Sequence, residues 1–143
     1  MFGMTPNPAK AYSNVSIETA VQEASPHKLI VLLFEGAREA VVIARSGIES
    51  GNIPQKGMAI TKAIDIILNG LRASLNLEEG GNIAQNLYAL YDYMARRLLH
   101  ANMRNDKAAL DEVLVLLSEI HSAWIVIGNK VESGESGNAG IGS

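Results

Sequence analysis

Apolar residues recur at intervals of three and four along four long segments of the chain, and Gly, Pro or Asn interrupts the pattern between them. The four segments span residues 26–50, 54–75, 83–101 and 107–127. No stretch shows the strict alternation of apolar and polar residues that a half-buried strand requires. Four long helices with short connections predict an all-α fold, an antiparallel four-helix bundle with an extra short N-terminal helix or arm.

Local signals set the expected boundaries. Ser25 can cap a first helix that starts at Pro26, and Gly80-Gly81 should end the second helix. Asn105 or Asp106 is expected to cap the fourth helix, and Gly128 to stop it. We therefore predict a mobile N-terminal arm over residues 1–24, a helical bundle over 25–127 and a disordered tail over 128–143.

The first predicted helix carries small residues on its apolar face. These residues would allow a neighbouring helix to approach closely. They are Gly36, Ala37, Ala40 and Ala44.

Composition excludes several classes of function. The 143 residues fit one domain, and they include no cysteine, which excludes disulfides and thiolate chemistry. The net charge is −3 and the basic residues are dispersed, so we expect no nucleic-acid partner. The longest strongly apolar stretch, Leu29–Phe34, is far shorter than the about 20 residues that span a bilayer. With no signal peptide at the N-terminus, these features predict a cytoplasmic protein without direct membrane insertion.

The hydrophobic fraction of 48% is high for a chain with only 19% charged residues. Either the core is generous, or some apolar surface is reserved for a partner. The tyrosines Tyr88, Tyr91 and Tyr93 lie within one stretch of the third helix, where they are either partner contacts or a mixture of core and surface residues.

The histidines give little support for catalysis. Glu119 and His121 lie two residues apart, on different helix faces, and no Glu-x-x-His pair typical of a di-iron bundle is present. His100 has Arg96, Arg97 and Arg104 nearby, which admits a histidine phosphotransfer bundle as an alternative, although a solvated polar face is the favoured interpretation. We therefore predict no metal, no cofactor and no enzymatic activity. His27, in the first turn of its helix, is expected to be exposed.

The order of several short motifs resembles one protein family. In the N-terminal half they are Ala11-Tyr12-Ser13-Asn14-Val15, Ala24-Ser25-Pro26-His27-Lys28-Leu29, Leu33-Phe34-Glu35-Gly36-Ala37 and Lys62-Ala63-Ile64-Asp65-Ile66-Ile67. In the C-terminal half they are Gly80-Gly81-Asn82-Ile83-Ala84, Leu90-Tyr91-Asp92-Tyr93-Met94, Arg96-Arg97-Leu98-Leu99 and Trp124. Over about residues 10–126 the chain resembles the flagellar secretion chaperones, the FliS family. Many relatives have Tyr-Asp where this chain has Phe34-Glu35, so one phenol hydroxyl is absent.

The resemblance implies a cytoplasmic export chaperone. Such a protein binds the amphipathic C-terminal segment of flagellin, prevents premature polymerisation and delivers flagellin to a membrane protein of the type III export gate, without a nucleotide. A helical adaptor with another client is the remaining alternative.

The second and third helices carry more apolar residues than one stripe needs, which predicts a client-binding groove on them. The groove residues would be Ile60, Ile66, Leu71, Leu75, Leu87, Tyr91, Met94 and Leu98. In the arm, Tyr12, Val15 and Ile17 would cover this groove or contact the export gate.

Overall fold

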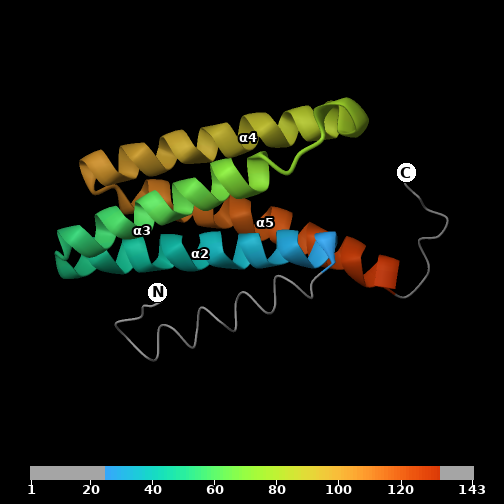
Figure 1. Cartoon of the computed structure of the whole chain (residues 1–143). Coiled ribbons are helices and arrows are strands. Elements are labelled where there is room, and N and C mark those ends of the chain that lie inside the picture. The colour runs from blue at the N-terminus through green and yellow to red at the C-terminus, as the bar shows by residue number, and fades with distance from the viewer. Residues whose placement is uncertain (1–24, 133–143) are drawn as a thin grey trace, which may run out of the picture.

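The computed structural model describes the backbone of residues 25–132 and the side chains of residues 25–126. Its elements are the α-helices α2 (Pro26–Ser50), α3 (Ile53–Asp65), α4 (Leu77–Arg104) and α5 (Lys107–Glu132), with a π-helix, η1 (Ile66–Arg72), that continues α3. Each successive long helix runs back along the one before it (Figure 1). The part of the chain described holds no strand, so the predicted all-α bundle is confirmed. The predicted arm and most of the predicted tail lie outside the described residues.

Short polar side chains begin the helices by accepting hydrogen bonds from backbone N–H groups that have no helical partner. Ser25 Oγ accepts from Lys28 N at 3.1 Å. The Oδ1 atoms of Asn52, Asn76 and Asp106 do the same for α3, α4 and α5, as the bonds to Gln55, Glu79 and Ala109 show. The predicted caps at Ser25 and at Asn105-Asp106 are confirmed, with Asn105 in the left-handed conformation that ends α4.

Two predicted boundaries were wrong. The third helix begins at Leu77, before Gly81, because Asn76 caps a helical turn that Glu78 and Glu79 stabilise near its positive end. The second helix ends earlier, where η1 stops at Arg72, and Gly81, with a non-helical φ of 57° and ψ of −136°, kinks α4 near its start. The fourth helix continues past Gly128 to Glu132, because a single glycine costs only about 1 kcal/mol inside a helix and does not by itself stop one.

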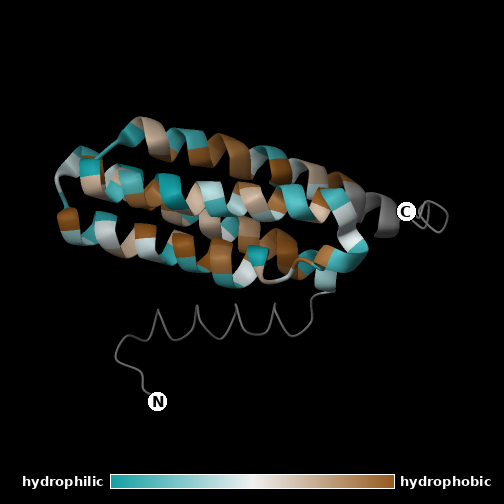
Figure 2. Cartoon of the chain, turned by 90° about the horizontal axis from the view of Figure 1, so that it is seen from above, coloured by the Kyte–Doolittle hydropathy of each residue, from teal (hydrophilic) through white to brown (hydrophobic). Residues whose placement is uncertain are grey.

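The core fills the space between all the helices. Its large, fully buried side chains include Phe34, Ile67, Leu110 and Leu117. Along each helix, apolar residues are interleaved with hydrophilic ones, as amphipathic helices require (Figure 2). Helix α2 packs against both α3 and α5. Of the predicted small residues, Ala37, Ala40 and Ala44 are buried and Gly36 is half-buried, and Gly47, farther along α2, is also buried.

Candidate functional site

Two of the three arginines near His100, Arg96 and Arg97, are engaged by carboxylates. Arg96 Nε lies 3.1 Å from Asp92, and Arg97 Nε lies 2.8 Å from Glu112. His100 Nε2 is itself 3.1 Å from an Asp106 oxygen. Most of the local positive charge is therefore paired, which makes the surroundings of His100 less suited to the anionic ligand that a phosphotransfer site requires.

His121 is a buried side chain between α2 and α5. It is 6% exposed, and its ring stacks on Phe34 with centroids 5.8 Å apart. Its Nδ1 lies 3.3 Å from Arg38 Nη1, and because arginine only donates, Nδ1 accepts and Nε2 carries the proton of the neutral ring. Burial lowers the pKa of His121, the Arg38 guanidinium lowers it further, and the Glu35 carboxylate opposes the change.

His27 is half-buried instead of exposed, because its ring packs against Trp124 with centroids 5.2 Å apart. Among residues 25–126, no three His, Asp or Glu side chains come close enough together to hold a metal ion. His27 of α2 and His121 of α5 thus contribute to the packing of these two helices.

The three clustered tyrosines separate into core and surface. Tyr91 is 2% exposed, and burial raises the pKa of its phenol to about 12. Tyr88 and Tyr93 are both exposed. The guanidinium of Arg72 lies 4.8 Å from the centre of the Tyr88 ring, and the Tyr93 hydroxyl donates a hydrogen bond to Glu112.

Most of the predicted groove residues belong to the core. Five of them are at most 2% exposed, so they offer no surface to a partner in this structure. They are Ile60, Leu71, Tyr91, Met94 and Leu98. Helical periodicity shows that a helix is apolar over a wide arc, but it does not show which side of that arc faces inward. The other three, Ile66, Leu75 and Leu87, are half-buried at the edge of the core.

Leu75 and Leu87 do line an apolar hollow, together with residues that the groove prediction missed. The hollow has a volume of about 370 Å³ and lies where α2, the connection after η1, the start of α4 and the end of α5 meet. We call it the Trp124 hollow. Its apolar lining is Ile30, Leu75, Ile83, Ala84, Leu87 and Trp124, and its polar lining is Ser74, Asn76, Glu79 and Gly80.

The kink at Gly81 gives the hollow one of its walls. Because the chain turns there, Asn76, Glu79 and Gly80 before the kink line the same space as Ile83 and Leu87 after it. Ile83 is 74% exposed, which is unusual for a large aliphatic side chain beside an apolar hollow. Ile83 and Trp124 were both visible in the apolar stripes of their helices, but their sequence positions did not show that they converge.

Comparison with known proteins adds the decisive observation. Residues 8–131 match the family model described as flagellar protein FliS. The chain belongs to the FliS family. A flagellar secretion chaperone FliS of Salmonella typhimurium is 56% identical over 127 residues, covering 89% of this chain and 94% of that protein. The FliS proteins of Vibrio cholerae and Bacillus subtilis are 44% and 31% identical, covering 80% and 82% of this chain and 84% of each relative.

The FliS match includes every element that lines the Trp124 hollow. No helix among the described residues is long and apolar enough to cross a membrane. The relatives are named flagellar secretion chaperones, so the chain belongs to a family of chaperones of the flagellar system. A chaperone acts through a surface that binds protein.

Proposed function

We propose that this FliS-family protein is a cytoplasmic export chaperone that binds the amphipathic C-terminal segment of flagellin. By covering that segment it prevents premature polymerisation, and it then delivers flagellin to the membrane component of the export gate. The proposal is supported by the family and by the printed names of the relatives, which are flagellar secretion chaperones. The single observation of this chain that carries it is the Trp124 hollow, an apolar space beside the exposed Ile83.

The hollow suits one face of an amphipathic helix. Apolar anchors of the client would contact Leu87 and Trp124, while Ser74 and Asn76 at the rim provide hydrogen-bond partners. A client that orders on binding loses about 2–5 kcal/mol of the gross interaction energy, so more contact area is required than one hollow gives. Leu77 and Ile125 are exposed and each follows a lining residue in the sequence, so they would supply part of the additional area.

Replacing Ile83 with glutamine should weaken the binding of the flagellin C-terminal segment about tenfold, because an apolar anchor at the hollow is lost. Ile83 is 74% exposed, so the fold should be unaffected. Met103→Gln is the matched control, since Met103 is 75% exposed on the same helix and does not line the hollow. Isothermal titration calorimetry against a peptide of the segment measures both. If the two variants bind the peptide with equal affinity, the Trp124 hollow is not part of the client-binding site.

The arm, whose residues lie outside the described part of the chain, completes the proposal. Tyr12, Val15 and Ile17 cover the client surface when no client is bound. A tethered segment has a high effective concentration, so weak contacts suffice. Deleting residues 1–20 should then tighten client binding or promote self-association, measured by calorimetry and by light scattering. If the truncated and full-length chains behave alike in both measurements, the arm has another role, such as contact with the export gate.

A further inference from the structure

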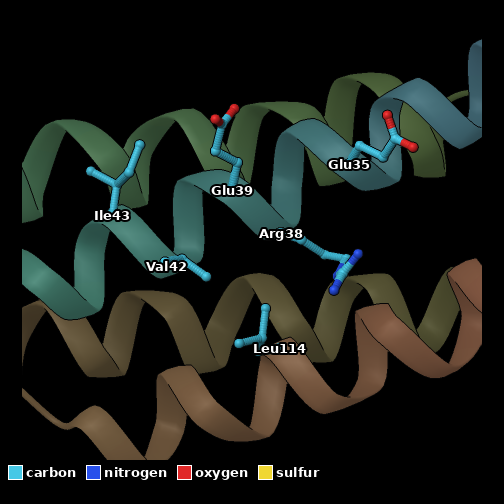
Figure 3. A pocket seen from close by; sticks show the side chains of 6 residues that line it. All are labelled: Glu35, Arg38, Glu39, Val42, Ile43 and Leu114. Atoms are coloured by element: carbon cyan, nitrogen blue, oxygen red, sulfur yellow. The ribbon is translucent and has the colours of Figure 1, made fainter.

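A second hollow lies between α2 and α5 (Figure 3). Its volume is about 490 Å³, and it is lined by Glu35, Arg38, Glu39, Val42, Ile43 and Leu114. None of these residues lines the Trp124 hollow. We call this second hollow the α2–α5 groove. Arg38 reaches toward α5 and Leu114 points back toward α2, whereas the Glu39 carboxylate points away from α5 (Figure 3).

The floor of the groove is apolar and accessible. Val42 is 51% exposed and Ile43 is 42% exposed, and Leu114 is half-buried. On α5, Val115 follows Leu114 and is 54% exposed. Two large aliphatic side chains that line the groove, Val42 and Ile43, thus lie open to solvent, which is typical of a surface that another protein covers.

The edge of the groove is acidic. Glu35 and Glu39 lie one turn apart on α2, where like charges repel each other. Among the described residues, the one ionisable basic group near Glu35 is His121, whose Nε2 lies 3.9 Å from a Glu35 carboxylate oxygen. Because the pKa of this buried histidine is lowered, its neutral ring does not balance the charge of Glu35. Glu39 has no ion pair within the described part of the chain. The Arg45 guanidinium, on the same helix, is already engaged by Glu49 and Asp111.

The groove also holds an unused hydrogen-bond donor. Arg38 Nε is buried and has no acceptor, and neither has Nε2 of the His121 ring that Arg38 contacts. Buried donors in proteins almost always have a partner. Because Nε is buried, an acceptor on a segment lying in the groove would reach it only after a movement of the Arg38 side chain.

We propose that the α2–α5 groove binds an amphipathic helix of a second protein, other than flagellin, whose lysines or arginines lie four residues apart and pair with Glu35 and Glu39. Charge complementarity selects this occupant. The two carboxylates outnumber the one cation in the lining, Arg38, so the groove disfavours anionic lipid and nucleic acid. The two ends of this chain also lack the paired basic residues that the groove requires. Residues 1–24 contain one basic residue, Lys10, and residues 133–143 contain none.

The test is site-specific photo-crosslinking in cells that make the full-length chain and flagellin. A p-benzoylphenylalanine at Val42 should crosslink to a protein segment with apolar residues on one face and basic residues four apart. The double variant Glu35→Lys/Glu39→Lys should reduce the yield about tenfold, and reversing the two basic charges of the captured segment should restore it. Glu119→Lys, an acidic residue exposed on α5 outside the groove, is the control and should leave the yield unchanged.

Several outcomes would overturn the proposal. One is crosslinking to flagellin, to residues 1–24 of the same chain or to a second copy of the chain. Another is crosslinking to a segment without paired basic residues, or no crosslinking at all. A crosslinking yield that stays the same when the charges are reversed would also overturn it. These outcomes are separable from the client proposal, because flagellin binding is measured independently with the Ile83→Gln variant.

Discussion

Gly47→Ala should lower the free energy of unfolding by about 2 kcal/mol, although alanine is the better helix former. A Cβ at position 47 would lie 2.9 Å from the backbone N of Lys56 and 3.1 Å from the carbonyl oxygen of Asn52. Both obstacles are backbone atoms at the start of α3, so the methyl group is accommodated only if α2 and α3 move apart. Thermal unfolding followed by circular dichroism should show a melting temperature roughly 6–8 °C lower.

Gly36→Ala is the matched control on the same helix. There the added Cβ would meet only the Cδ1 atom of Ile66, at 3.4 Å, which is an ordinary contact with a flexible side chain. The gain in helix propensity, about 0.5–1 kcal/mol, should therefore make this variant as stable as the wild type or more so. If both variants lose stability equally, close approach of α2 and α3 at Gly47 does not explain the effect.

Lys56→Met should destabilise the bundle by about 2 kcal/mol, because it leaves two acceptors without their donor. Lys56 is 5% exposed, and its ammonium group donates to the carbonyl oxygen of Asn102 at 2.9 Å and to Asn105 Oδ1 at 2.5 Å. These bonds join the start of α3 to the last turn of α4 and to its C-cap residue, Asn105. Chemical denaturation should show a lower midpoint and an unchanged slope.

Lys62→Met provides the comparison for Lys56, since Lys62 is on the same helix and is exposed. Surface substitutions of this kind usually change stability by less than about 0.5 kcal/mol. Equal denaturation midpoints for the two methionine variants would mean that the buried ammonium group contributes nothing net to stability.

The helix count and most helix starts were predictable because their causes are local. Ser25, Asn105 and Asp106 act within one turn of their own positions, so their side-chain types are sufficient evidence. The π-helix at Ile66–Arg72 was not predictable in this way, since it preserves the run of apolar residues that an α-helix would show.

The candidate site was less predictable because it depends on which chain segments meet. Tyr91 and Met94 look the same in sequence as Leu87, yet only Leu87 reaches the hollow. Lys56 is the converse case, since a lysine is expected at the surface and its partners are at least 46 residues away in sequence. Both distinctions arise from tertiary packing.

The most direct test of the chaperone function is co-purification with full-length flagellin and with flagellin that lacks its C-terminal segment, followed by calorimetry. The account predicts a one-to-one complex with full-length flagellin, a strongly negative heat-capacity change from buried apolar surface, and no complex with the truncated form. Equal binding of both forms, or binding of neither, would contradict it.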